Sequence, residues 1–300
     1  MKYLSTLGLG TLAGFLARLY MLRRDYRQYP SYPQGWAIHL FLGFIGGLIG
    51  AVIVPALMDG DFSAVSFLLL AATQFREVRN MERQTLTAME ATELVGRGSG
   101  YIEGIARVFE ARNYLAIWVA LAVAVTVQAC SPNLALQITG SVVVGMLSAW
   151  LLNHLMHGQV VGDIAHVELA PLAFDGPVLQ VGGVQVMNVG MAEARKTWLD
   201  RGLGVQIKPK GPDAKATLAN IGQMQAIAHD VTAMIGLYMD VGEQEFVPIV
   251  RRERESGSLV LAIVPSEQDA DALLDAVRRV PVLEGAVRRP LQSRAGRMVD

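Results

Sequence analysis

The chain has 300 residues, of which 52% are hydrophobic and only 18% are charged. Soluble globular domains carry about 25% charged residues, so the composition excludes an ordinary soluble protein over the whole length. The formal net charge of −1 excludes a strongly basic nucleic-acid-binding protein, and the single Cys130 excludes an internal disulfide and a four-cysteine zinc site.

The first two apolar runs cover residues 3–22 and 36–57. Arg23, Arg24 and Arg27 follow the first run, whereas a cleaved signal peptide carries its positive charge in front. The first run therefore predicts a retained span that ends in the cytoplasm. The second run begins at Trp36, an interfacial anchor, and is long enough for a hydrocarbon core of about 30 Å.

Small residues four positions apart recur in the apolar runs. In lipid this spacing lets helix backbones approach one another closely, so it predicts helix-packing faces. The glycines with this predicted role are Gly10, Gly14, Gly43, Gly46, Gly47, Gly50 and Gly145.

Residues 62–75 form a third apolar run that is shorter than the 20 or so residues expected of a span. Arg76, Arg79 and Arg83 follow it and favour the cytoplasm. Two alternatives remain: the run crosses back and continues as a cytoplasmic helix to about residue 95, or it is re-entrant. Helical spacing then ends at the glycine-rich stretch 96–100.

Residues 114–130 and 134–156 predict a membrane hairpin with a tight turn at 131–133. The arginine clusters fit about five spans, with the N-terminus outside and the C-terminal domain in the cytoplasm. The predicted organisation is a helical membrane domain at 1–157, with a cytoplasmic helical insertion at about 76–113. A small soluble α+β domain at 158–290 and a polar tail at 291–300 follow.

The soluble domain is predicted from strand and helix periodicities. We expect short strands at 164–169 and within 178–189, with turns at 175–177 and at Gly182–Gly183. Further strands are expected at 205–208, 245–250, 258–264 and 281–287, and helices at 191–200, 214–238 and 266–277. This order predicts helices packed on one sheet. His229 and Asp230 argue against a sixth span at 214–238, because charge at the centre of a span is costly.

The sequence contains no recognisable catalytic or metal-binding signature, so we expect no enzyme activity, cofactor or metal. His154, His157, Asp163, His166 and Glu168 match no known ligand spacing. Gly96, Gly98 and Gly100 follow a helical pattern and not a strand, which favours a hinge over a phosphate-binding loop. A small-solute transporter or channel is the alternative, and its candidate polar groups are His39, Gln128, Gln137 and Asn153. His39 lies within a turn of its span's start, which favours an interfacial position.

Residues 101–106 read Tyr-Ile-Glu-Gly-Ile-Ala. With this hexapeptide and apolar spans on both sides, the chain resembles the YIEGIA-domain membrane proteins of endospore-forming Firmicutes. The resemblance implies a bacterial membrane protein tied to sporulation, with no established enzymatic activity and a small soluble partner described as a capping-complex subunit. It marks the hexapeptide as the candidate partner-binding site. With Arg107 added from helix spacing, the candidates are Tyr101, Ile102, Glu103, Gly104, Ile105, Ala106 and Arg107.

On a helix, Tyr101 and Ile105 share an apolar face, and Glu103 precedes Arg107 by four positions, a pairing worth about 0.3–0.5 kcal/mol when exposed. Glycine inside a helix costs about 1 kcal/mol relative to alanine, so Gly104 predicts a close contact. One interpretation is a cytoplasmic helix packed on the membrane bundle with a surface ion pair. The other is a docking face for a partner protein or a second copy of the chain, in a non-enzymatic protein of the lipid bilayer.

Overall fold

The computed structural model describes residues 3–25, 33–130, 132–155, 158–239 and 246–290. The chain forms two compact units. The first, here the helical unit, comprises Met1–Arg83 and Ile105–His157, and the second, here the C-terminal unit, comprises Gln84–Gly104 and Gly158–Asp300. Residues 84–104, which lie between the two parts of the helical unit in sequence, therefore group with the distant C-terminal residues.

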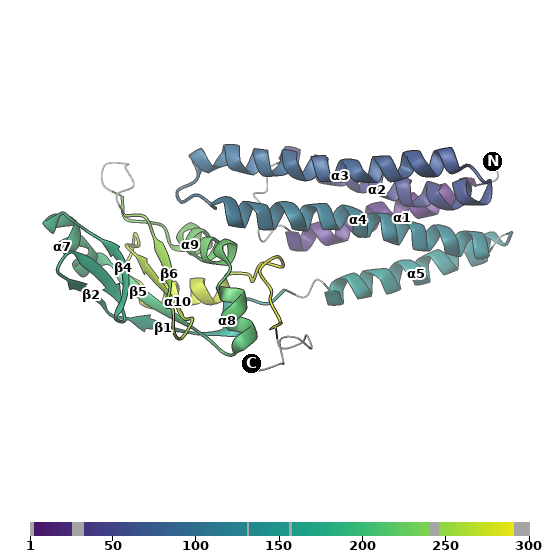
Figure 1. The fold of residues 1–300 in the computed structure, drawn as a ribbon. Helices are drawn as coiled ribbons and strands as arrows, with labels where there is room; N and C mark the ends of the chain where they lie inside the picture. The colour runs from purple at the N-terminus through teal and green to yellow at the C-terminus, as the bar shows by residue number, and fades with distance from the viewer. Residues whose placement is uncertain (1–2, 26–32, 131, 156–157, 240–245, 291–300) are drawn as a thin grey trace, which may run out of the picture. The chain divides into compact units, whose positions relative to one another are not determined.

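In the described ranges, five long helices supply the helical unit: α1 (Leu4–Asp25), α2 (Pro33–Met58), α3 (Phe62–Met89), α4 (Ser99–Ala129) and α5 (Leu134–Leu155). They run alongside one another (Figure 1). The Tyr3 hydroxyl donates to Asp59 Oδ1 at 2.6 Å, and Gln128 Nε2 donates to Thr6 Oγ1 at 2.5 Å. The beginning of α1 therefore lies beside the ends of α2 and α4, so successive helices alternate in direction.

Four helices of the described chain are long and apolar enough to cross a membrane: Leu4–Arg23, Gly35–Met58, Ser99–Ala129 and Leu134–Leu152. The prediction of a helical membrane protein is confirmed at this level. α3 is not among the four, because its apolar part ends at Phe75 and charged residues follow. Phe75 nevertheless packs between Ile49 of α2 and Ile117 of α4, so this part of α3 belongs to the bundle core.

Glycines bring the helix backbones of the bundle together. A Cβ on Gly14 would lie 2.6 Å from the Cα of Gly47, and one on Gly47 would lie 2.7 Å from the Thr11 carbonyl oxygen. Each of these distances is far below van der Waals contact, so only glycine permits the observed packing. Gly10, Gly43, Gly46 and Gly50 also lie against neighbouring helices, whereas a Cβ on Gly145 would meet no described atom within 4 Å.

Two antiparallel sheets form the framework of the C-terminal unit within the described residues. The larger has the order β1 (Ala165–Ala170), β5 (Leu203–Pro209), β7 (Leu259–Ile263) and β6 (Ile249–Arg252). The smaller contains β2 (Leu172–Asp175), β3 (Val178–Val181) and β4 (Val184–Asn188). All five residues of β7 are buried, which places this strand at the centre of the unit.

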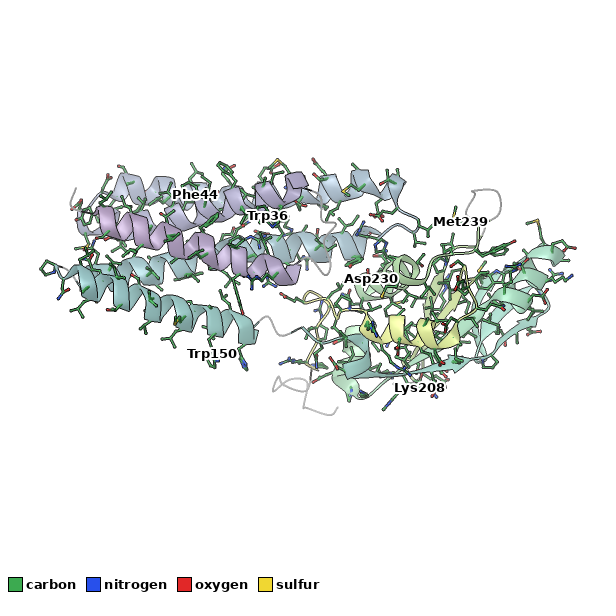
Figure 2. The ribbon with its side chains drawn as sticks, turned by 180° about the vertical axis from the view of Figure 1, so that it is seen from behind. Trp36, Phe44, Trp150, Lys208, Asp230 and Met239 are labelled. Carbon is green, nitrogen blue, oxygen red and sulfur yellow. The ribbon has the colours of Figure 1, made fainter. Side chains whose placement is uncertain are left out.

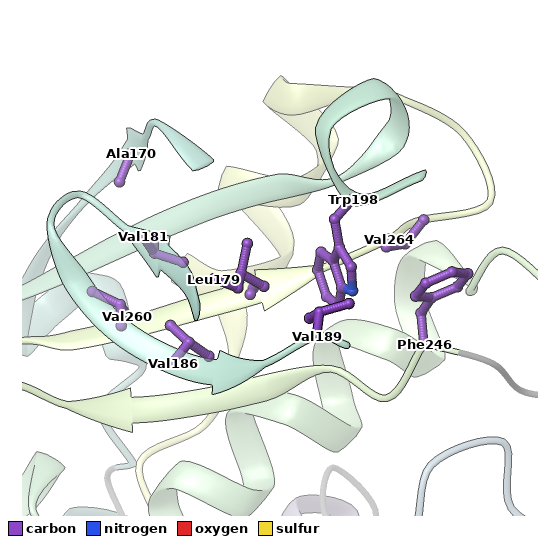
Figure 3. Packing of buried hydrophobic residues seen from close by; sticks show 10 residues of the cluster. Ala170, Leu179, Val181, Val186, Val189, Trp198, Phe246, Val260 and Val264 are labelled. Atoms are coloured by element: carbon purple, nitrogen blue, oxygen red, sulfur yellow. The ribbon is translucent and has the colours of Figure 1, made fainter. Parts of the chain in front are cut away.

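Trp198 organises the core between the sheets (Figure 3). It comes from α7 (Ala192–Arg201) and meets the Phe246 ring edge-on at 5.8 Å between centroids. Leu179 of β3 and Val260 of β7 join the same cluster. The remaining helices of the described unit are α6 (Val161–Ile164), α8 (Pro212–Leu218), α9 (Ile221–Ile235) and α10 (Ala270–Arg279).

Three predictions for this unit are wrong. The single predicted sheet is two sheets, because the chain turns back twice between residues 172 and 188. The predicted helix 214–238 is two helices, because the Asn220 side chain accepts from the Gln223 amide at 3.2 Å and starts α9 anew. The predicted strand 281–287 is irregular apart from a bridge between Val160 and Pro281, since its amides bond elsewhere. The first residue of the predicted strand 245–250, Glu245, lies outside the described residues.

Candidate functional site

The segment Gln84–Gly104 is a helix–loop–helix connection closed by one carboxylate. α3 ends at Met89 and a 3₁₀ turn follows at Glu90–Thr92. The Glu90 carboxylate then accepts from the backbone amides of Arg97 at 2.8 Å and Gly98 at 2.9 Å. Gly98 has a φ of 77°, a left-handed backbone geometry that residues other than glycine rarely adopt. These features hold the loop in one shape and start α4 at Ser99.

The beginning of α4 docks on α9 through two glycines. A Cβ on Gly222 would lie 2.6 Å from the Gly100 carbonyl oxygen, and a Cβ on Gly100 would lie 2.9 Å from the Gly222 nitrogen. The Gln225 Oε1 atom accepts from the Gly100 amide at 2.9 Å and the Tyr101 amide at 3.1 Å. The first amides of a helix have no partner within that helix, so Gln225 of α9 caps the beginning of α4.

Tyr101 is the deepest side chain of this contact, with only 1% of its surface exposed. Its hydroxyl donates to the Asp230 carboxylate, 3.2 Å from Oδ1 and 3.4 Å from Oδ2, and Figure 2 labels Asp230 on α9. Burial raises the pKa of Asp230 to about 7, although the hydrogen bond from Tyr101 and the charge of Arg97 act in the opposite direction. The carboxyl group therefore titrates near neutral pH.

His229 fixes the preceding loop. Its Nδ1 lies 2.6 Å from the Val95 carbonyl oxygen, and since that oxygen can only accept, Nδ1 carries the proton. Burial lowers the pKa of His229, so the ring is the neutral Nδ1–H tautomer at neutral pH. The ring also lies edge-on to Tyr101, with 6.0 Å between centroids. His229 and Asp230 thus hold the loop and the beginning of α4 from one turn of α9.

The seven predicted site residues differ in accessibility. Tyr101, Ile102, Ile105 and Ala106 are buried, Glu103 and Gly104 are half-buried, and Arg107 is exposed. A Cβ on Gly104 would meet only the Leu283 Cδ1 atom at 3.6 Å, an ordinary van der Waals distance. The close approach expected at Gly104 therefore lies at Gly100, four residues earlier.

The sequence did not reveal the docking partners of the hexapeptide. Gln225 follows Gly100 by 125 residues, and nothing local to either position signals the contact. His229 and Asp230 were informative only as charges that oppose a membrane span. Their unusual place, in the middle of an otherwise apolar helix face, was the one available signal of a buried polar contact.

The other candidate polar residues are dispersed. His154 stacks on Trp150, the Asp163 carboxylate accepts from the Val160 amide, and Glu168 pairs with Lys208. His157 and the side chain of Asn153 lie outside the described residues. Over the ranges the structure describes, no three histidine, cysteine, aspartate or glutamate side chains gather in a metal-binding group.

A buried polar cluster in the helical unit was not predicted. Arg18 is fully buried, and its Nη2 lies 2.9 Å from the Nδ1 of His39. Since a guanidinium only donates, His39 accepts through Nδ1. Glu82, beyond the candidate spans, is also buried, and burial raises the pKa of its carboxyl to about 7 against the lowering effect of Arg18. His39 itself is buried within the helical unit.

Comparison with known proteins covers nearly the whole chain. A family model described as "YIEGIA protein" matches residues 6–293. The chain is 43% identical over 283 residues to a Bacillus subtilis (strain 168) protein named "Uncharacterized protein YphB". The aligned region covers 94% of this chain and 93% of the relative. No solved structure matches the chain. With its hexapeptide at residues 101–106 and a family match from residue 6 to residue 293, the chain belongs to the YIEGIA protein family.

Proposed function

We propose that this chain is a non-enzymatic, multi-pass membrane protein that holds its C-terminal unit at the membrane and binds partner proteins or copies of itself. In this proposal the hexapeptide is a joint that couples α4 to the C-terminal unit. The observation that carries it is the capture of the Gly100 and Tyr101 amides by Gln225, together with the burial of Tyr101.

The polar groups of the joint favour a role in positioning α4 against α9 over a role in catalysis. The Tyr101 hydroxyl, the first amides of α4 and the His229 ring all form structural hydrogen bonds. A buried group in such a bond stabilises one arrangement, and breaking the bond leaves a costly unsatisfied group. The proposed role needs no cofactor. The buried face of the hexapeptide serves the joint, and the proposed contact with partners is assigned to the half-buried Glu103 and the exposed Arg107.

The proposed partner is either a second copy or a small soluble protein of the capping-complex type that the family resemblance implies, and the proposed setting is sporulation. Glu103→Gln is expected to leave the chain inserted and monodisperse but to weaken retention of the partner. Glu267→Gln, which changes an exposed acid elsewhere in the C-terminal unit, is the matched control. Quantitative co-purification after membrane solubilisation measures the effect, and equal retention by both variants would contradict a role for Glu103.

We infer that the N-terminus lies outside the cell and the C-terminal unit in the cytoplasm, with residues 62–75 as a fifth crossing. Support comes from α3, which begins at the bundle end that contains Asp59 and carries Arg76 and Arg79 on its later part. An impermeant thiol reagent tests this through Cys130. Labelling in intact cells is expected, whereas labelling only in inverted vesicles would reverse the orientation.

The buried pair of Arg18 and His39, which lie within candidate spans, favours a second candidate, a small-solute transporter or channel. The charge of Arg18 also acts on Glu82, which is buried beyond the spans. Ionisable groups inside a helical membrane bundle are costly and commonly mark ion or solute pathways. Solute or proton flux in proteoliposomes distinguishes this candidate. Flux that depends on Glu82, compared between the unaltered chain and Glu82→Gln, would favour transport over a purely structural role.

A further inference from the structure

A hollow of about 450 Å³ opens on the C-terminal unit, away from the Tyr101 contact. Three stretches form it: the residues that precede β1, the β5–α8 connection and the irregular segment after Pro281. Its polar lining includes Gln159, Lys210, Asp213, Thr217, Arg288 and Arg289. The volume lies within the range of about 300–1,000 Å³ that is common for small-molecule sites.

The charge of the lining is strongly one-sided. Lys210, Arg288 and Arg289 are positive, and Asp213 is the only acid among the lining residues. Within the described part of the chain, none of the three cations forms an ion pair with a carboxylate. One acid against three bases leaves the hollow with a net positive charge, which attracts anions.

Two of the cations are held in place by neutral groups. Lys210 Nζ donates to the carbonyl oxygens of Gly162 at 2.8 Å and Asp163 at 3.1 Å. Arg288 Nη1 donates to the carbonyl oxygens of Gly285 at 2.9 Å and Val287 at 3.0 Å. Carbonyl groups orient a cation without cancelling its charge. The ammonium keeps a third N–H for a ligand, and the Arg288 guanidinium keeps its Nε and Nη2 donors.

The backbone around these cations is also fixed. The Arg288 amide donates to the Thr217 hydroxyl oxygen at 3.1 Å, which ties the last described segment to α8. Side chains that are ordered before binding lose less conformational entropy when the ligand arrives. The hollow therefore combines uncompensated charge with preorganised donors.

We propose that this hollow binds a phosphate-bearing anion. Guanidinium groups match phosphate oxygens with paired N–H donors, and a lysine ammonium adds a point charge, so two arginines and a lysine favour phosphate over a halide. The phosphate can belong to an anionic lipid headgroup or to a soluble phosphate ester. The lipid is the nearer source in sequence terms, because Gln159 follows Leu152, the last residue of a candidate membrane span, by only seven positions.

The test uses the full-length chain purified in an uncharged detergent. Three probes are titrated by isothermal calorimetry: inorganic phosphate, a short-chain phosphatidylglycerol below its micellar concentration, and the matching zwitterionic phosphatidylcholine. Arg289→Gln is the first variant, since Arg289 is exposed and forms no hydrogen bond in the described structure. Lys210→Gln with Arg289→Gln is the second, and Arg279→Gln on α10 is the control for loss of one exposed positive charge.

Saturable binding of phosphatidylglycerol is expected, at least tenfold weaker in the double variant and unchanged in Arg279→Gln. Binding of inorganic phosphate with equal loss in the double variant also supports the site and identifies a soluble phosphate ester as the ligand source. Absence of saturable binding for all three probes would overturn the proposal. Binding that is equally strong in the double variant, or equally weakened in Arg279→Gln, would overturn it as well. The unfolding midpoint of each variant is measured without any probe, and a midpoint equal to that of the unaltered chain shows that the variant folds.

Discussion

Replacement of Gly222 by alanine is expected to loosen the contact between α9 and the hexapeptide helix. The new Cβ would lie 2.6 Å from the Gly100 carbonyl oxygen and 2.8 Å from the Gly100 carbonyl carbon. Both are backbone atoms, so no side chain can swing away to relieve the overlap. To reach the ordinary contact distance of 3.4 Å, the two backbones must separate by about 3.4 − 2.6 = 0.8 Å.

The magnitude follows from two opposing terms. Inserting a methyl group into a packed contact costs about 1–3 kcal/mol, and the separation also stretches the hydrogen bonds from the Gly100 and Tyr101 amides to Gln225, each worth about 0.5–1.5 kcal/mol. Alanine regains about 1 kcal/mol over glycine within a helix. The expected net loss is about 1–3 kcal/mol of local stability.

Hydrogen–deuterium exchange of the full-length protein in detergent measures this loss directly. The amides of Gly100 and Tyr101 become unprotected when the contact opens, so their exchange is expected to accelerate by about 5- to 150-fold, at 1.4 kcal/mol for each factor of ten. The amides of β7 lie in the core of the same unit and report any general destabilisation.

Gly104→Ala is the matched control, because it makes the same chemical change within the hexapeptide itself. Its Cβ would meet only Leu283 Cδ1 at an ordinary 3.6 Å. We expect it to be neutral or to stabilise α4 by up to about 1 kcal/mol. Equal exchange rates for Gly222→Ala and the unaltered chain would contradict a close backbone contact at Gly222. A Gly104→Ala variant as unstable as Gly222→Ala would contradict it as well.

Three further predictions concern other contacts. Asp230 has a pKa of about 7 in the folded protein, above the ordinary aspartate value of 3.8. Its contribution to stability is therefore complete below pH 3.8 and is lost as pH rises through about 7. Urea unfolding between pH 5 and 8 should show a decline of up to about 1.4 kcal/mol per pH unit that Asp230→Asn removes, and equal pH slopes would contradict this. Gln223→Ala removes two hydrogen bonds, one from Gln223 Nε2 to the Pro281 oxygen and one from the Leu283 amide to Gln223 Oε1. Because the buried Leu283 amide is left unsatisfied, urea unfolding should show a loss of about 2–3 kcal/mol in the free energy of unfolding. Gly47→Ala should lower the unfolding midpoint of the helical unit, whereas Gly145→Ala should not, since its surroundings are open.

The membrane character of the chain followed from its sequence because a span must satisfy its backbone within one helix and expose apolar side chains along its length. Both conditions are local. The same holds for several elements of the C-terminal unit, where alternating and helical periodicities predicted β1, β5, β7, α7 and α10. The break at Asn220 was missed because the apolar periodicity continues across it while a single cap decides the boundary.

The hexapeptide at residues 101–106 was recognisable in the sequence, and with it the family. Its physical role was not, because Gly222, Gln225 and Asp230 join it from more than a hundred residues away. Only the tertiary structure brings a second glycine against Gly100 and places a carboxylate at the Tyr101 hydroxyl. The buried pairing of Arg18 with His39 was hidden for the same reason. Periodicity reports which face of an element is buried, whereas the partner on the other side of that face depends on how the whole chain packs.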